Sequence, residues 1–331
     1  MENLIVVDGD FETQLRRNLV QREMLDNTFA LQALLNNKYA VYQTHLDYLR
    51  AGAQIIRTNI YRTSLSKYCY LPQHENLPIL HTSVQLAKQA LYKYNDEMRS
   101  YSCTFKYRSQ PLLAGSLSSY FSSFEDETNG LNNITNTSEY SLFLYHRQNA
   151  RELLNAGVDL LAFESIPCMS EANAIANMLK FTPNIRMWIT FSCQPNGLLL
   201  DGTPFTKAVN YYCDTLSSQI CAIGAKCSLS SSMKSLMREI NKKHFIPFVF
   251  YADKCHFSTK EANSASIAAP QNNFVEELFD CGVRYIGGGT NTVAEDIREI
   301  RKQADNYNSK KKIFTSLNSC SHQNTLNQSK L

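Results

Sequence analysis

Short apolar runs alternate along the chain with longer segments of mixed polarity. Eight of these runs are rich in β-branched or aromatic residues and almost continuously apolar, as strands covered on both faces must be. They read "LIVVDGD", "AQIIRTN", "PLLAGS", "VDLLAFES", "MWITFSC", "CAIGAKCS", "FVFYADKC" and "RYIGGGT". Amphipathic segments such as "SVQLAKQALYKYNDEM" lie between them, which predicts parallel strands joined by helices. Eight units favour a single-domain α/β fold, a (β/α)8 TIM barrel, over an open sheet.

Two further patterns set the expected boundaries of this barrel. The strand entries "AGAQII", "AGVDLL" and "CGVRYI" each place a glycine two residues before the apolar run, where a helix would end in a glycine cap. From residue 306 onward the chain is polar and has no periodicity. We therefore expect a barrel over residues 1–305 and a disordered polar tail over residues 306–331.

Charge and composition exclude several classes of function. The net charge is only +3 over 331 residues, and the one basic cluster is Lys310 to Lys312, so neither nucleic acid nor a membrane is an expected partner. The ten cysteines lie without CxxC pairs, which indicates reduced thiols in a reducing compartment. A small polar molecule remains the expected ligand, and a cytoplasmic location is the default.

The last three residues change the expected location. Ser329, Lys330 and Leu331 spell the peroxisomal address, which a receptor reads at a free C-terminus. The sequence therefore predicts peroxisomal import, with the import receptor as a partner.

Polar residues follow most of the predicted strands. In a barrel they would converge on the face where such enzymes keep their active sites. The candidates are Asp8, Thr58, Asn59, Ser116, Glu164, Ser192, Cys227, Asp253 and Thr290. Glu164 stands out because it directly follows "LLAF", and a buried carboxylate is costly unless a cation pairs with it.

Five motifs in order along the chain resemble those of one enzyme family. They read "VDGDFETQL", "THLDYLRAGAQIIRTNIY", "LLAGSLSSY", "LLNAGVDLLAFESIPCMSEA" and "AIGAKCS". Together they resemble the homocysteine S-methyltransferase family over roughly residues 4 to 303. The resemblance implies a barrel enzyme that transfers a methyl group to homocysteine to give methionine, from S-methylmethionine, S-adenosylmethionine or betaine.

The resemblance also implies an amino-acid pocket. The turn at Asp8 and Gly9 would meet the carboxylate and the amino group of homocysteine, and Glu164 would bind the amino group. Thr58 and Asn59 match a Thr-Asn pair that lines the family's site. The implied partners are homocysteine and a methyl donor, either S-methylmethionine or S-adenosylmethionine.

The family activates its substrate with zinc, because a free thiol with a pKa near ~8.5 is mostly protonated at neutral pH. The resemblance implies three cysteine ligands, one after the sixth strand and two adjacent ones after the eighth. Cys227 matches the first ligand, but Gly289 and Thr290 stand where the adjacent pair is expected. Cys255 and His256 are possible substitute ligands by residue type.

Three interpretations of the function remain open from the sequence. The first is an S-methyltransferase that rebuilds the zinc site or works without it. The second is a pseudoenzyme that binds homocysteine or another amino acid without chemistry, which the loss of two expected ligands favours. The third takes "GGGTNTVAEDI" as a phosphate-binding turn, in which Thr292 and Glu295 form a capping box that opens the last helix.

Overall fold

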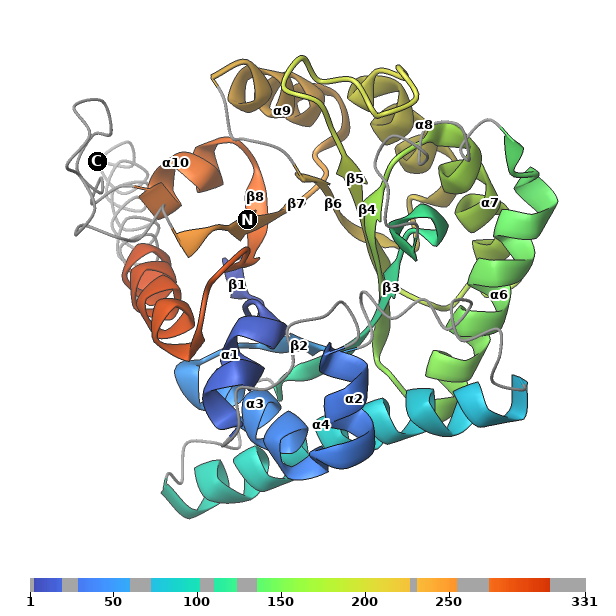
Figure 1. Ribbon diagram of the computed structural model, residues 1–331. Coiled ribbons are helices and arrows are strands. Elements are labelled where there is room, and N and C mark those ends of the chain that lie inside the picture. The colour runs from blue at the N-terminus through green and yellow to red at the C-terminus, as the bar shows by residue number, and fades with distance from the viewer. Residues whose placement is uncertain are drawn as a thin grey trace, which may run out of the picture.

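Eight parallel strands form the centre of the molecule and helices surround them (Figure 1). The computed structural model describes residues 3–19, 29–59, 73–101, 110–123, 136–226, 231–254 and 274–309. The strands are β1 (Ile5–Val6), β2 (Ile55–Arg57), β3 (Leu112–Ser118), β4 (Leu160–Ile166), β5 (Met187–Ser192), β6 (Ile220–Lys226), β7 (Phe248–Ala252) and β8 (Val283–Gly288). Each overlaps one of the eight apolar runs and extends at most two residues beyond it, so the predicted strands are confirmed.

Helices follow the strands and form the outer ring. They are α1 (Phe11–Asn18), α2 (Phe29–Asn36), α3 (Lys38–Ala51), α4 (Gln73–Tyr101), the 3-10 turn η3 (Tyr120–Ser123), α6 (Glu139–Ala156), α7 (Met169–Leu179), α8 (Phe205–Leu216), α9 (Ser231–His244), α10 (Phe274–Asp280) and a last helix over residues 294–309. The three predicted glycine caps are confirmed, because Gly52, Gly157 and Gly282 have φ values of 103°, 85° and 94° at helix ends.

The strands pair in the order β1-β8-β7-β6-β5-β4-β3-β2, all parallel. The ring closes between β1 and β2 through one bridge, Val7 to Ile55. Two backbone hydrogen bonds flank this bridge, from Asp8 N–H to the Ile55 carbonyl at 3.0 Å and from Gln54 N–H to the Val6 carbonyl at 2.7 Å. The predicted (β/α)8 barrel is therefore confirmed, with β1 as its shortest strand.

Alternate strand residues fill the inside of the barrel. They form a separate apolar cluster inside the barrel, which includes Trp188. The buried members are Val7, Ile55, Ala114, Leu160, Ala162, Trp188, Cys221, Ala222 and Val249. Because side chains alternate along a strand, the residue two positions later points the same way. This rule places Arg57, Ser116, Glu164 and Tyr251 directly above the apolar interior, at the carboxyl ends of their strands.

The other set of strand residues faces the helices. Large side chains such as Phe163, Phe191 and Phe248 belong to one continuous cluster with the apolar stripes of the surrounding helices. A strand covered on both faces is nearly continuously apolar for this reason. The barrel thus holds its strand ends rigidly, which is what positions polar groups at its mouth.

The last helix continues beyond the predicted end of the barrel. It runs to residue 309, four residues into the segment predicted as a disordered tail. Two contacts account for the extension. Tyr307 packs on Phe279 with ring centroids 4.5 Å apart, and the Asn308 side chain accepts from Leu4 N–H at 3.1 Å. The three residues of the predicted peroxisomal address lie outside the described residues.

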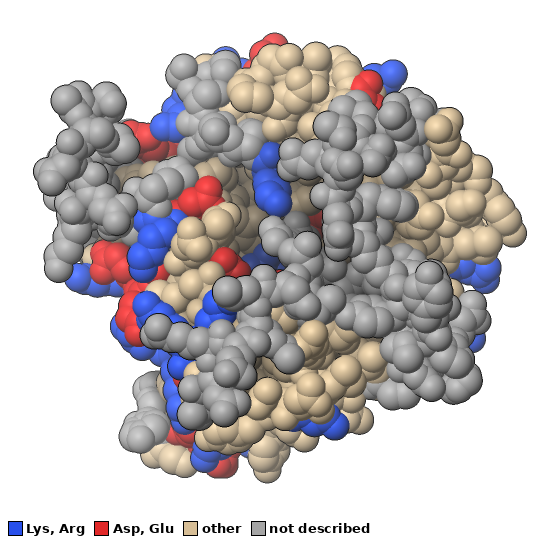
Figure 2. Space-filling view, viewed as in Figure 1, with Lys and Arg blue, Asp and Glu red and all other residues tan. Residues whose placement is uncertain are grey.

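Charges of both signs are interspersed on the face seen in Figure 2. Ion pairs among the described residues include Arg17 with Glu295 at 2.6 Å and Lys254 with Asp296 at 2.8 Å. Within the described part of the chain, none of the helices is both long enough and apolar enough to pass through a bilayer.

Gly224 in β6 is tightly enclosed, and we expect its replacement with alanine to destabilise the barrel. An added Cβ would lie 2.5 Å from the carbonyl oxygen of Val249 on the neighbouring strand, and a backbone atom cannot turn aside as a side chain can. Overpacking of this kind costs about 1–3 kcal/mol. Urea unfolding of Gly224→Ala measures the loss, and a change within about 0.5 kcal/mol would contradict this description of the strand pair.

Candidate functional site

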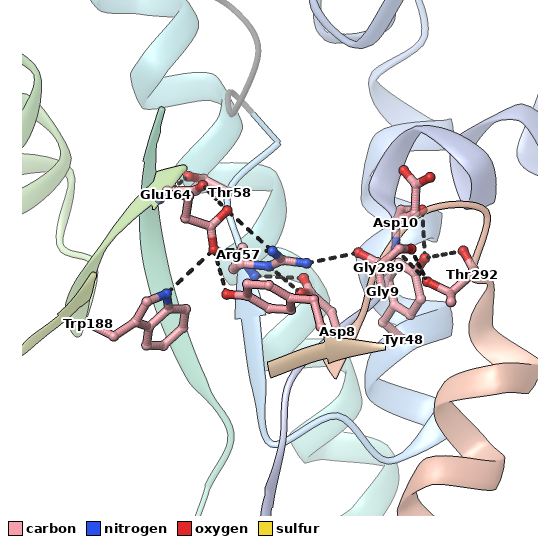
Figure 3. A network of polar contacts seen from close by, with 12 residues as sticks. Asp8, Gly9, Asp10, Tyr48, Arg57, Thr58, Glu164, Trp188, Gly289 and Thr292 are labelled. Atoms are coloured by element: carbon pink, nitrogen blue, oxygen red, sulfur yellow. Dashed lines mark hydrogen bonds and ion pairs between the residues drawn. The ribbon is translucent and has the colours of Figure 1, made fainter. Parts of the chain in front are cut away.

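The guanidinium of Arg57, at the end of β2, lies between the carboxylates of Asp8 and Glu164 (Figure 3). Its Nε donates to Asp8 Oδ1 at 2.7 Å, and its backbone N–H donates to Asp8 Oδ2 at the same distance. Its Nη1 lies 3.2 and 3.3 Å from the two oxygens of Glu164. Nη2 donates to the Gly9 carbonyl at 3.0 Å. One cation therefore joins the turn after β1 to the end of β4.

Glu164 has further donors besides Arg57. The phenol of Tyr251 donates to its Oε1 at 2.6 Å, and the indole Nε1 of Trp188 lies 3.4 Å from the same oxygen. The hydroxyl of Ser116 lies 3.4 Å from Oε2. Arg57 also stacks on the ring of Tyr251, 4.5 Å from its centroid. The cationic partner that the burial of Glu164 demands is thus a residue of the chain itself.

The side chains of Asp8, Arg57 and Glu164 differ in solvent exposure. The side chains of Asp8 and Glu164 are 2% and 4% exposed, whereas that of Arg57 is 16% exposed. Burial raises the pKa of Asp8, and the nearby Arg57 opposes that rise. Burial alone would lower the pKa of Arg57, but Asp8 and Glu164 outweigh it and raise that pKa well above its ordinary value. The guanidinium therefore stays charged and covers the carboxylates.

A backbone irregularity in β4 accompanies Glu164. The pairing of β4 with β5 shifts register between Phe163 and Ile166, and Ser165 adopts a φ of 61°. Its N–H donates to the hydroxyl of Thr190 at 2.9 Å, and its carbonyl accepts from Ser192 at 3.1 Å. A positive φ at a non-glycine residue stores strain of order 1–3 kcal/mol. The bulge thus fixes the strand end that carries Glu164.

The turns after β1 and β8 are packed directly against each other. A Cβ on Gly288 would come within 2.9 Å of the Gly9 Cα, so only glycine allows this approach. The buried phenol of Tyr48 donates to the Asp10 carbonyl at 2.7 Å and lies 3.3 Å from the Thr292 carbonyl. These contacts hold the Asp8 turn in place, and Tyr48 is a site residue that the sequence analysis did not single out.

The glycine-rich turn at the end of β8, residues 288–292, donates its backbone N–H groups to acceptors within the protein. Five consecutive N–H groups have protein acceptors: Gly288 to Asp8 O, Gly289 to Ala252 O, Thr290 to Asp253 Oδ1, Asn291 to Asp10 Oδ2 and Thr292 to Gly289 O. A phosphate cradle needs such groups free to face the anion. This turn offers none of them, so its glycines serve close packing instead.

The predicted capping box at the start of the last helix is wrong. The hydroxyl of Thr292 accepts from Asp10 N–H at 3.1 Å and donates to the Gly289 carbonyl at 2.6 Å. Glu295 pairs with Arg17 instead of reaching back to Thr292. Both side chains serve contacts with the α1 region, because the β1 and β8 turns lie so close together.

Asp253 fills the space beside the two positions where the zinc cysteines are expected. A Cβ on Gly289 would collide with its Oδ1, which accepts from Thr290 N–H at 2.6 Å. Neither glycine nor threonine supplies a thiolate. Among the described residues, no three His, Cys, Asp or Glu side chains form a group that could hold a metal ion. Cys227, Cys255 and His256 lie outside the described residues.

Thr58 and Asn59 lie at the strand ends as predicted and contact other parts of the barrel. The Thr58 hydroxyl accepts from Ser116 N–H at 2.9 Å, and Asn59 Oδ1 accepts from the Ser83 hydroxyl at 2.6 Å. Asn59 is buried, and its Nδ2 has no hydrogen-bond partner among the described residues. That amide can therefore donate to a ligand or a water.

A second buried network supports the loop after β3. Glu171 on α7 and His146 on α6 are fully buried and 2.8 Å apart, Oε1 to Nε2. The same carboxylate accepts from the Ser119 hydroxyl at 2.7 Å and from Tyr120 N–H at 2.6 Å. Three donors, one from α6 and two from the segment that follows β3, thus converge on one carboxylate, which fixes the backbone next to the barrel mouth.

The structure brings together Asp8, Gly9 and Glu164 of the predicted site, and it does so through Arg57. The sequence analysis missed Arg57, although a signal was present. Arg57 stands two residues after Ile55 in an otherwise apolar strand, which places it on the inner face of the barrel. A cation at such a position is the partner that a buried carboxylate requires.

Comparisons with known proteins agree on one family. The homocysteine S-methyltransferase family model matches residues 5–304. A betaine-homocysteine S-methyltransferase of Drosophila melanogaster is 29% identical over 321 residues, which cover 93% of this chain and 96% of that relative. The homocysteine S-methyltransferase YbgG of Bacillus subtilis is 30% identical over 302 residues, 90% of this chain and 93% of that protein. The metallated crystal form of the Escherichia coli homocysteine methyltransferase MmuM superimposes with a TM-score of 0.77 at 25% identity, covering 91% and 96% of the two chains.

Proposed function

The chain belongs to the homocysteine S-methyltransferase family, and on that premise we propose that it binds a thiol of the homocysteine class at the mouth of the barrel and methylates its sulfur. The observation that carries this proposal is the buried network of Asp8, Arg57 and Glu164. It lies at the carboxyl ends of the strands, where barrel enzymes bind their substrates. The Asn59 amide, whose Nδ2 has no hydrogen-bond partner in the part of the chain that the structure describes, is a further polar group at the same strand ends.

The proposed reaction is a direct transfer between two sulfur atoms. The acceptor thiol loses its proton to solvent, and its thiolate attacks the methyl carbon of an onium donor such as S-methylmethionine or S-adenosylmethionine. The new sulfur–carbon bond forms as the donor's sulfur–carbon bond breaks, so the donor leaves as a neutral thioether. The residues described here would bind and orient the acceptor, which supplies part of the rate through proximity.

A second candidate function is binding without transfer, and the Gly289 region favours it. The family lowers the pKa of the acceptor thiol with zinc held by three thiolates. This chain has Gly289 and Thr290 at two of those positions, and the Asp253 carboxylate fills the adjacent space. Bringing a thiol pKa from ~8.5 to 7 requires about 2 kcal/mol from some source. We therefore propose that the three-thiolate zinc site of the family is not built in this chain.

Two measurements on the purified protein test these candidates. Calorimetry measures binding of homocysteine and of 4-mercaptobutyrate, which has the same carbon chain and thiol but no amino group. An assay for the S-methyl product, with S-methylmethionine or S-adenosylmethionine as donor, measures transfer. We expect binding that falls at least tenfold in Glu164→Ala, because this variant removes the carboxylate that Arg57 and Tyr251 contact.

The outcomes separate the two candidates. Turnover of either thiol supports the methyltransferase, while binding without product from either donor supports the binding protein. Zinc content per chain is measured on the same preparation, and stoichiometric zinc that is lost in Cys227→Ser would contradict the proposal that the zinc site is absent. If neither thiol binds or is methylated, both candidate functions are wrong.

A further inference from the structure

Arg57 occupies the space between two buried carboxylates where a ligand's positive charge would otherwise bind. We propose that Arg57 determines the acceptor class of this site: a thiol whose polar end is a carboxylate without a free ammonium group beside it. This inference rests on the proposed function, because it concerns the same site. It goes further by naming the group that the site rejects.

The contacts of the two carboxylates are the first step of the argument. Asp8 accepts from Arg57 through both of its oxygens at 2.7 Å. Glu164 accepts from Tyr251 at 2.6 Å and contacts Arg57 through both oxygens. A carboxylate binds a ligand's ammonium group through the same lone pairs. An ammonium group would therefore have to displace donors that already belong to the protein.

Access is the second step. The two carboxylates are almost completely enclosed, and the guanidinium is the more exposed member of the three. Displacing it would leave a charged side chain without the partners that its burial requires, which is strongly unfavourable. The stacking of Arg57 on Tyr251 and its bond to the Gly9 carbonyl would be lost as well. An arriving ligand thus meets a guanidinium and not a carboxylate.

The net charge of the site and the geometry of its contacts predict opposite ligand preferences, so a binding measurement can decide between them. Asp8, Glu164 and Arg57 together carry one negative charge, and that net charge alone would favour a ligand with an ammonium group. The geometry favours the opposite. Nη2 of Arg57 carries a second N–H beyond the one bonded to the Gly9 carbonyl, and an arginine N–H can donate to a ligand's carboxylate but not to an ammonium group. Whether the site prefers a ligand with or without an ammonium group shows whether net charge or contact geometry dominates.

Calorimetry with a matched pair of thiols tests the proposal. Homocysteine and 4-mercaptobutyrate have the same chain, thiol and carboxylate, and differ only in the amino group. We expect the wild-type protein to bind 4-mercaptobutyrate at least tenfold more tightly than homocysteine. In Arg57→Gln, which frees the carboxylates and removes the guanidinium, we expect that ratio to shrink or reverse. Arg50→Gln is the control, because Arg50 pairs with Glu97 on the outer helices.

Each outcome bears on the proposal. Equal or tighter binding of homocysteine by the wild-type protein overturns it and leaves the proposed function standing. An unchanged ratio in a folded Arg57→Gln protein also overturns it. Absence of both binding and methylation for both thiols overturns the proposed function as well. Should Arg57→Gln fail to fold, a third ligand, N-acetylhomocysteine, is tested on the wild-type protein instead. Acetylation removes the positive charge of the amino group. If the wild-type protein binds N-acetylhomocysteine more weakly than homocysteine, the proposal is contradicted.

Discussion

Replacing Arg57 with methionine is expected to lower the free energy of unfolding by about 3–5 kcal/mol at neutral pH, the cost of removing one partner from a buried ion pair. Methionine has similar length and no charge, so the loss comes from the ionic contacts. Asp8 and Glu164 would remain buried with no cation between them. Urea unfolding, with the slope m unchanged, measures the difference.

The loss should depend on pH. Burial raises the pKa of Asp8 in the folded protein, and Arg57 opposes the rise. Without Arg57 the folded-state pKa rises further above the unfolded value of ~3.9. A carboxyl group with a raised folded-state pKa stabilises the fold below the unfolded pKa, and this contribution is lost as the pH rises through the folded-state pKa. The methionine variant should therefore lose least stability near pH 4 and most at pH 8.

Arg50→Met is the matched control for this comparison. Arg50 also makes two contacts with a glutamate, Glu97, but its side chain is 44% exposed. An exposed pair contributes only about 0–1 kcal/mol. Equal losses in the two methionine variants, or a loss at Arg57 that does not change with pH, would show that the buried network does not have the role described.

Glu171→Ala is the second substitution with a large expected effect, about 3–5 kcal/mol of unfolding free energy. The change leaves three donors without their acceptor: the Ser119 hydroxyl, Tyr120 N–H and His146 Nε2. Buried donors that lose their acceptor cost about 1–3 kcal/mol each in desolvation, although neighbouring losses do not add fully. Unfolding in urea, followed by circular dichroism, measures the effect.

The variant Glu171→Gln separates the stability due to the hydrogen bonds of Glu171 from the stability due to the volume of its side chain. Glutamine has the same shape but one carbonyl oxygen, so it keeps some of the three contacts and loses at least one. We expect its loss to be about 1–2 kcal/mol, clearly below that of alanine. If the two variants lose the same amount, the cavity and not the hydrogen bonds would account for the stability.

The barrel was predictable because its signal is long and repeated. Eight apolar runs, each bounded by helix-length segments, allow few other arrangements, and the three glycine caps confirm the helix ends that the pattern indicated. The tail boundary was less predictable, since residues 306–309 are polar in sequence. Their helix depends on distant contacts, such as that of Tyr307 with Phe279.

The site could be predicted only in part. Asp8, Gly9 and Glu164 follow from strand ends and family motifs, and the need of Glu164 for a cation follows from its burial. Which cation satisfies that need depends on which strands are neighbours across the barrel, because Arg57 and Glu164 are 107 residues apart in sequence. The capping box failed for a similar reason. Thr292 is close to Asp10, 282 residues away, and this contact outweighs the local pattern.

The position of Asp253 beside Gly289 also bears on how this chain can evolve. A cysteine introduced first at residue 289 would collide with the Asp253 carboxylate, and a change first at Asp253 would leave Thr290 N–H without its acceptor. Either order of mutation passes through a less stable intermediate. A cysteine at residue 289 therefore requires a compensating change at Asp253, so we expect the effects of substitutions at these two positions to be coupled.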